Sequence, residues 1–278
     1  MNPANKSYQA FKKAKFPTLK TTSYFNVYDY LLTPYRGKNV TFIEIGVAGG
    51  GGLFMWRNFL GDRARIIGID LNPEAKKFEK YGFEIYIGDQ ADKNFWIKFL
   101  KKIKSIDIIL DDGGHTYEQQ IISLESLIES VNDGGLYITE DTHTSYQSGF
   151  GSRTFSFMSY VKKLIDDINF RYYSLKEKHA SEHRIYSIQI FESIVAFYID
   201  RRESVSPSKP ITNKFNVQIP QDFRYADNYS LWAAIKIINK CKSLKFAKSS
   251  LSKWMAKALI NFISRYLVKT NKVREFFK

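Results

Sequence analysis

Two short stretches of the chain each bring carboxylates and an imidazole together directly after an apolar run. They read Asp-Asp-Gly-Gly-His from position 111 and Glu-Asp-Thr-His from position 140. The carboxylates of Asp112, Glu140 and Asp141 are hard oxygen ligands that suit a Mg²⁺-like ion, which keeps positions open for water or substrate oxygens. His115 lies three residues past Asp112, near enough to take a proton from a hydroxyl held on that ion. These residue types therefore fit a metal-assisted proton abstraction.

Each of these residues also has a purely structural interpretation. An isolated Asp-Asp pair after a strand can cap a helix, and His115 alone could be a capping or core residue. The second acidic pair, which follows one strand–helix–strand unit later, favours the metal interpretation. For His143 we leave three roles open: a supporting contact to the metal site, a substrate contact and a structural role.

The elements that must position these residues alternate between residues 40 and 139. Repeated strand–helix units predict a parallel sheet with helices on both faces, the doubly wound α/β class. The predicted strands are Val40–Ile45, Arg65–Asp70, Phe83–Ile87, Ile106–Leu110 and Gly134–Thr139. The predicted helices are Gly51–Leu60, Pro73–Lys80, Asp92–Lys102 and Thr116–Val131, after a tyrosine-rich helix at Tyr24–Tyr35.

Beyond this alternation the pattern predicts a helix at Phe155–Ile168 and three further strands. Those strands are Phe170–Ser174, Ile185–Phe191 and Ser193–Ile199. The last two meet at a tight turn around Glu192 and so form an antiparallel hairpin. This ending is usual for class I methyltransferases, whose mostly parallel, Rossmann-like sheet has seven strands.

Acidic residues gather where the predicted strands end. Sheets of this class bind ligands beyond the carboxyl ends of their strands. The acids at or just after these ends are Glu44, Asp70, Asp89, Asp111, Asp112, Glu140 and Asp141. This is more charge at one edge than solvation requires, so we expect the binding site there.

The glycine-rich stretch after the first strand favours one kind of nucleotide. Glu44, Gly46 and Gly50 fit the pattern E-x-G-x-x-x-G, whereas G-x-G-x-x-G is not met because position 48 is alanine. Dinucleotide folds need that second glycine to admit a pyrophosphate. S-adenosylmethionine has no phosphate, so the loop favours it and wraps its methionine end. Asp70 suits the ribose of either cofactor, and a tight turn without a ligand is the alternative.

Taken together, these motifs resemble one known family, the metal-dependent sugar O-methyltransferases typified by the macrocin and mycinamicin enzymes of macrolide biosynthesis. The resemblance covers about residues 20 to 200. Its blocks are Ser23–Tyr28, Tyr35–Arg36, the glycine loop with Met55–Trp56, Gly68–Asp70, Gly88–Asp92, Asp111–His115, Gly134–Tyr146 and Ile188–Asp200.

The resemblance implies a site and a reaction. It implies that Asp112, Glu140 and Asp141 hold Mg²⁺ or a similar divalent cation and that His115 is the general base. The residues that it places at S-adenosylmethionine are Glu44, Asp70, Asp89 and Gln90. The expected reaction is direct methyl transfer to a sugar hydroxyl that the metal and His115 activate.

The segment Ser145–Tyr160 is rich in glycine and aromatic residues. Glycine hinges with exposed rings suit a lid over a sugar, whose apolar face stacks on aromatic side chains. The alternative is that the later rings pack the following helix onto the sheet. Tyr146 and Phe150 are the better lid candidates and, with His143, are our predicted substrate contacts.

Positive charge belongs to the end of the chain. The chain has 278 residues and a formal net charge of +14. Positions 201–278 hold 17 Lys and Arg against four acids, a net +13, so the first 200 residues carry about +1. We therefore expect a helical segment at 1–38, a methyltransferase domain at 39–202 and a basic helical extension at 203–278, and we do not expect nucleic acid binding.

In the extension, apolar residues recur every three or four positions from Leu251 to Leu267, with lysines on most other faces. This pattern predicts a basic amphipathic helix. Such a helix suits an anionic membrane surface, or it packs on the catalytic domain or a second subunit of a homo-oligomer. These alternatives stay open at this point.

Composition favours a reducing compartment. Cys241 is the single cysteine, so an internal disulfide is excluded. The first 20 residues lack the apolar run of a signal peptide, and nowhere do 18 apolar residues follow one another. We expect a cytoplasmic protein, with the tail as its only prospective contact to the inner face of the membrane.

Two classes of function remain. One is a sugar O-methyltransferase that acts on a bacterial surface polysaccharide or a glycosylated natural product. The other is a catalytically inactive methyltransferase fold that binds a membrane or partner through its basic tail. Every proposed catalytic position is filled, which favours the enzyme.

Overall fold

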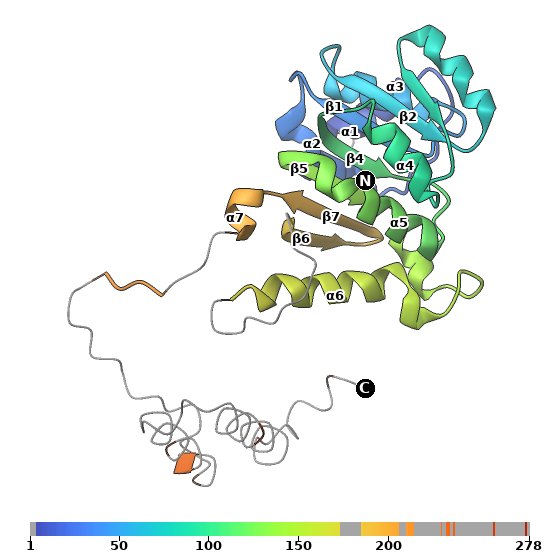
Figure 1. The fold of residues 1–278 in the computed structure, drawn as a ribbon. Coiled ribbons are helices and arrows are strands. Elements are labelled where there is room, and N and C mark those ends of the chain that lie inside the picture. Colours follow the sequence, from blue (N-terminus) through green and yellow to red (C-terminus); the bar gives the residue numbers. More distant parts are fainter. Residues whose placement is uncertain are drawn as a thin grey trace. The chain divides into compact units, whose positions relative to one another are not determined.

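The computed structural model describes residues 4–172, 185–205 and 210–213, and six single positions farther along (229, 232, 233, 236, 258 and 276). The chain divides into two compact units, residues 1–209 and 210–278. The elements below belong to the first unit (Figure 1). The amphipathic helix predicted between Leu251 and Leu267 lies outside the described residues, apart from position 258.

In the described part of the chain, one seven-stranded sheet has the order β3-β2-β1-β4-β5-β7-β6. Strand β7 runs antiparallel to both of its neighbours, and the other pairs are parallel. The strands are β1 (Thr41–Ile45), β2 (Arg65–Asp70), β3 (Glu84–Ile87), β4 (Ile106–Asp111), β5 (Val131–Thr139), β6 (Ile185–Phe191) and β7 (Ile194–Ile199). The predicted doubly wound sheet with a closing hairpin is confirmed.

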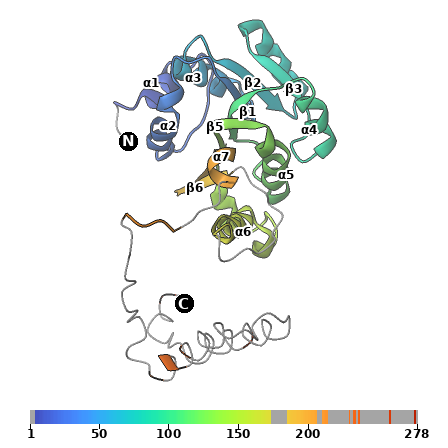
Figure 2. The same ribbon diagram turned by 60° about the vertical axis from the view of Figure 1, so that its left-hand side comes forward.

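Helices cover both faces of the sheet, as the two views in Figures 1 and 2 show. Alternate residues of a strand point to opposite faces, so Phe42 packs in the layer of α1, α2 and α3, and Ile43 in the layer of α4, α5 and α6. The α-helices are α1 (Lys6–Lys12), α2 (Tyr24–Leu32), α3 (Gly51–Leu60), α4 (Lys93–Leu100), α5 (Tyr117–Leu127), α6 (Phe157–Phe170) and α7 (Arg201–Val205). The 3₁₀ segments are Thr33–Tyr35, Pro73–Tyr81, Ile128–Ser130, Thr142–Tyr146 and Arg153–Phe155.

The structure differs from the predicted elements at a few places. Helix α6 continues to Phe170, where we expected a strand to begin, and positions 173 and 174 of that strand lie outside the described residues. The helix starts at a side-chain cap, because the Ser156 hydroxyl accepts from the amide of Ser159. The predicted helix at Pro73–Lys80 is a 3₁₀ segment that ends at Gly82, whose φ of 83° suits glycine. Helix α1 was not predicted.

Candidate active site

The predicted acids converge because β4 and β5 are adjacent parallel strands. Asp111 of β4 is in register with Thr139 of β5. The residues that follow, Asp112 on one strand and Glu140 and Asp141 on the other, therefore leave the sheet side by side at its carboxyl edge. The amide of Glu140 donates to the Asp111 carbonyl at 2.9 Å and fixes this junction.

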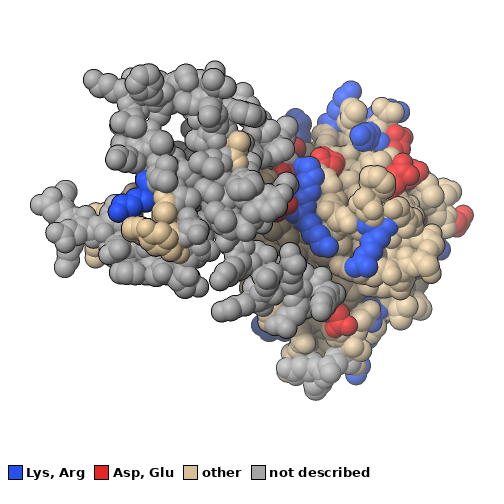
Figure 3. Space-filling model, turned by 90° about the horizontal axis from the view of Figure 1, so that it is seen from below, with Lys and Arg blue, Asp and Glu red and all other residues tan. Residues whose placement is uncertain are grey.

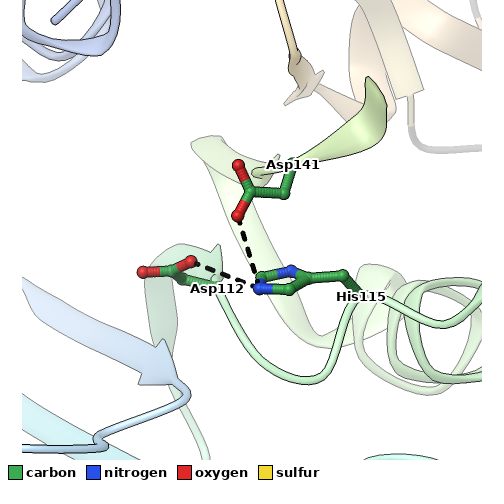
Figure 4. Close-up of side chains that lie close together, drawn as sticks. All are labelled: Asp112, His115 and Asp141. Atoms are coloured by element: carbon green, nitrogen blue, oxygen red, sulfur yellow. Dashed lines mark ion pairs between the residues drawn. The ribbon is translucent and has the colours of Figure 1, made fainter. Parts of the chain in front are cut away.

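Asp112, His115 and Asp141 form a compact group (Figure 4). The Nε2 atom of His115 lies 3.3 Å from an oxygen of Asp141 and 4.0 Å from an oxygen of Asp112. One ligand atom from each residue lies within 4.8 Å of the other two. The group has the size and the donor types of a site for a divalent cation.

Glu140 lies beside this group but its carboxylate is held by other side chains. The Tyr28 hydroxyl donates to one oxygen at 2.5 Å, and the Lys20 ammonium donates to the other at 2.9 Å. The same ammonium reaches Asp112 at 2.5 Å. Burial and the charge of Asp112 raise the pKa of Glu140 above its ordinary value, while Lys20 and Tyr28 oppose that shift.

Three donors to these acids come from residues that the sequence analysis did not single out. Tyr24 and Tyr28 are four residues apart and therefore lie on one side of α2, and Lys20 lies in the irregular segment just before that helix. The Tyr24 hydroxyl donates to Asp141, so every predicted metal ligand has a donor from this segment. The four-residue spacing is visible in the sequence. No sequence motif, however, connects these residues to acids that lie more than 90 positions farther along the chain.

Four non-glycine residues of the described chain have a positive φ, and all lie around this edge. They are Ala48, His115, Asp141 and Ser193, with φ between 45° and 62°. Such backbone is uncommon and concentrates at functional sites. The Ser193 hydroxyl lies 2.9 Å from the Tyr24 oxygen and 2.5 Å from Nδ1 of His143. His143 thus contacts the network around Asp141, which favours a supporting role for it.

A pocket with a volume of about 330 Å³ opens beside the acids. Five of the predicted site residues line it: Gly46, Asp70, Asp89, Gln90 and Asp112. A Cβ at Gly46 would lie 2.1 Å from the Asp112 carbonyl oxygen, and its φ is 93°, so this close approach of two loops requires glycine. Because Asp112 belongs to both, the pocket and the acidic group form one site.

Glu44 and Gly50 are not among the lining residues. Glu44 is buried, and one of its carboxylate oxygens accepts from the Trp56 indole at 2.9 Å. Its other oxygen has no hydrogen-bond partner among the described residues, and burial raises the pKa of Glu44 to about 7. Gly50 begins α3 with φ 80°, and a Cβ there would overlap the ring of Phe78. Cofactor contacts from these two residues stay predictions.

Two lining residues shape the pocket through their own hydrogen bonds. Asp70 accepts from the amides of Val47 and Ala48 at 2.9 and 2.8 Å, which fixes the glycine loop. The Gln90 side chain donates to Asp111 at 3.0 Å and accepts from Gly114 at 2.9 Å. Both residues therefore preorganise the loops around the pocket, whichever contacts they make to a ligand.

The predicted lid segment contains both exposed and buried rings. Tyr146 is 57% exposed, and the guanidinium carbon of Arg153 lies 5.1 Å from the centroid of the Tyr146 ring. Phe157 is fully buried in the core. Phe150 lines a second pocket of about 490 Å³ between this segment and α5. The packing interpretation therefore holds for the later ring, and Tyr146 and Phe150 stay candidates for a lid.

Comparisons with known proteins bear on this geometry. No model of a protein family matches the chain. The rhamnosyl tetracenomycin-C 2'-O-methyltransferase of Streptomyces olivaceus is 30% identical over 158 residues, which cover 53% of this chain and 41% of that enzyme. Demethylmacrocin O-methyltransferase of Streptomyces fradiae is 32% identical over 51% of this chain and 38% of its own length. The chain thus spans about two fifths of the length of these curated relatives.

Solved structures show the same likeness at the level of the fold. The MycE methyltransferase from the mycinamycin pathway, in complex with Mg and SAH, superposes with a TM-score of 0.67 at 25% identity, over 81% of this chain and 60% of that one. Its complex with Mg, SAH and mycinamycin VI gives a TM-score of 0.65 at 26% identity, over 81% and 58% of the two chains. This chain has the class I methyltransferase fold. The predicted resemblance to the macrocin and mycinamicin sugar O-methyltransferases is confirmed.

In this methyltransferase fold, the pocket lies at the carboxyl ends of β1, β2, β3 and β4, where doubly wound sheets bind their ligands. The acidic group lies beside it, at the ends of β4 and β5. Asp112 therefore connects the pocket with the metal-binding group.

Proposed function

We propose that this chain is an S-adenosylmethionine-dependent and Mg²⁺-dependent O-methyltransferase that methylates a sugar hydroxyl. The observation that carries the proposal is the position of Asp112, which lines the nucleotide-sized pocket and also belongs to the group with His115 and Asp141. Three of the relatives are named as O-methyltransferases of rhamnosyl or olivosyl compounds, and the similar MycE structure contains Mg and SAH.

The residues present fit both cofactors. Asp112, Glu140 and Asp141 would hold the ion, since their carboxylates are the hard donors that Mg²⁺ prefers. When bound, the ion supplies a Lewis acid that lowers the pKa of a coordinated hydroxyl and orients it. For S-adenosylmethionine, the pocket offers Asp70 and Asp89 to the nucleoside and the glycine loop to the methionine end.

In this proposal His115 is the general base. When bound, S-adenosylmethionine would supply the methyl group, and Nε2 of His115 would take the proton of the acceptor hydroxyl. The carboxylate of Asp141, 3.3 Å from Nε2, stabilises the imidazolium that forms. Tyr24 donates to that carboxylate and keeps it in place. A positioned base of this kind contributes about 10²–10⁴ in rate.

We further propose that the acceptor is a sugar of a bacterial surface polysaccharide or of a glycoside. Tyr146 and Phe150 would stack on the sugar, as the lid interpretation predicts. The basic tail would bring the protein to the inner face of the membrane or pack on another subunit. Among the residues that the structure describes, no helix has the length and apolarity that a membrane span needs.

The first 200 residues carry a net charge of only about +1, which does not favour nucleic acid as the substrate. On the face of the first unit shown in Figure 3, Lys and Arg side chains lie interspersed with Asp and Glu. A nucleic acid footprint would instead require a basic patch beside the site.

Ligand binding separates this function from that of an inactive binding module. We expect S-adenosylhomocysteine to raise the midpoint of thermal unfolding, and Mg²⁺ to raise it further. The variant Asp112→Asn should lose the Mg²⁺ effect, because it removes a carboxylate charge, and the exposed Asp62→Asn should keep it. A protein that binds neither ligand would contradict the proposal.

A further inference from the structure

Lys20 is a buried cation that lies among three carboxylates, those of Asp112, Glu140 and Glu44. We call these three acids the acidic cluster. Its side chain is 2% exposed, and its ammonium lies 2.5 Å from Asp112 and 2.9 Å from Glu140. Burial by itself would lower the pKa of Lys20, but the carboxylates of Glu140, Asp112 and Glu44 raise it above its ordinary value. The cluster therefore contains one fixed positive charge from the chain itself.

The ammonium uses carboxylate oxygens that a metal ion would also need. One oxygen of Glu140 accepts a hydrogen bond from the Lys20 ammonium, and the other accepts one from the Tyr28 hydroxyl. Asp112 has one oxygen on Lys20, while its other oxygen faces His115. An ion that binds Asp112 and Glu140 together would therefore compete with the ammonium for these oxygens.

We propose that Lys20 is a built-in cation that holds Asp112 and Glu140 together without metal and is displaced from them when the divalent ion binds. The inference rests on the proposed function, because it concerns the same metal site. Its physical basis is that the buried Glu140 and the partly buried Asp112, each within 3 Å of one ammonium, would otherwise repel each other. Lys20 lowers that cost and, by the same interaction, weakens the affinity for Mg²⁺.

The chain around Lys20 suits such an exchange. Lys20 lies between α1, which ends at Lys12, and α2, which begins at Tyr24. The neighbouring Leu19 is 92% exposed, so its side chain does not anchor the segment. Pro17 packs against the glycine loop, since a Cβ at Gly51 would lie 2.4 Å from its carbonyl oxygen. The segment is thus anchored three residues before Lys20, and the lysine side chain can move without unfolding the sheet.

The first test measures Mg²⁺ affinity by calorimetry in the full chain. Lys20→Met keeps the length of the side chain and removes the charge, and Lys13→Met removes an exposed lysine of the same segment as the matched control. We expect Lys20→Met to bind Mg²⁺ about tenfold more tightly or better, and to gain more thermal stability from Mg²⁺ than the wild type does. The control should match the wild type. Equal or weaker Mg²⁺ binding by Lys20→Met would overturn the inference.

The second test uses the wild-type protein, so it does not depend on the folding of a variant. A buried, hydrogen-bonded ammonium gives a protected ¹⁵N–H signal in NMR, which Lys20→Arg assigns by its loss. We expect this signal without metal and expect it to vanish or shift strongly at saturating Mg²⁺. A signal unchanged by bound Mg²⁺ would overturn displacement. Failure of Mg²⁺ to bind at all would instead contradict the proposed function.

Discussion

At the scale of single residues, the site combines a base with an acidic neighbour. His115 presents Nε2 to Asp141 and Asp112, while its buried Nδ1 has no hydrogen-bond partner among the described residues. The backbone of His115 is left-handed, with φ 58°, and its ring faces Asp112 and Asp141. The orientation of this base thus comes from the backbone and from the two carboxylates.

His115→Ala should therefore lower turnover by about 10²–10⁴-fold, because only the proton acceptor is lost. Binding of S-adenosylhomocysteine should stay within a few-fold of the wild type, since His115 does not line the pocket. Methyl-transfer rates and calorimetry on the same preparation would measure both. Undiminished turnover would remove His115 from the reaction.

At the scale of elements, α2 acts as a support for the acids. Tyr28 is fully buried and donates to Glu140, and Tyr24 donates to Asp141 from one turn earlier. Burial and Glu140 raise the pKa of Tyr28 well above its ordinary value, so its hydroxyl stays a donor. The helix therefore fixes two ligands that come from a different part of the sheet.

Tyr28→Phe should lower the free energy of unfolding of the metal-free protein by about 1–3 kcal/mol, because an oxygen of buried Glu140 loses its donor. Tyr30→Phe is the matched control on the same helix, because Tyr30 is 65% exposed, and it should change stability by less than about 0.5 kcal/mol. Urea unfolding of both variants gives the comparison. Equal effects of the two changes would show that the Tyr28 hydroxyl does not support Glu140.

The local pattern of apolar residues predicted most of the strands and helices. The contacts that it missed join residues that are far apart in the sequence. Short runs of apolar residues located β1 to β5 and the hairpin, because strands that are buried on both faces are apolar along most of their length. The same reasoning placed Asp112, Glu140 and Asp141 at one edge. It missed Lys20 and Tyr28, because their contacts to these acids form only when the fold brings the segment before the sheet to its carboxyl edge.

At the scale of the whole molecule, the stability of the metal-free protein should depend on pH through Glu44. Burial raises the pKa of Glu44 from 4.5 to about 7. The folded state thus binds this proton more tightly than the unfolded state, so its contribution is full below about pH 4.5 and is lost as the pH rises through about 7. Without metal, the buried Glu44 carboxylate therefore makes the fold less stable at neutral pH than below pH 4.5.

Glu44→Gln removes this dependence. The free energy of unfolding of the variant, minus that of the wild type, should rise by about 3 kcal/mol between about pH 4.5 and about pH 7.5. Glu74→Gln, at an exposed position, is the matched control. Denaturant unfolding at several pH values, with chelator present, provides the measurement. A flat difference for Glu44→Gln would mean that this carboxyl titrates alike in both states.

Methyl transfer itself tests the central claim most directly. Labelled S-adenosylmethionine would be incubated with the protein and with separated sugar nucleotides, glycosides, lipid-linked glycans and polysaccharides, each with Mg²⁺ and with a chelator, and with Asp112→Asn as the control. We predict label in a glycan or glycoside fraction that requires both Mg²⁺ and Asp112. Label that persists with chelator, or no label in any fraction from protein that binds the cofactor, would contradict a metal-dependent sugar O-methyltransferase.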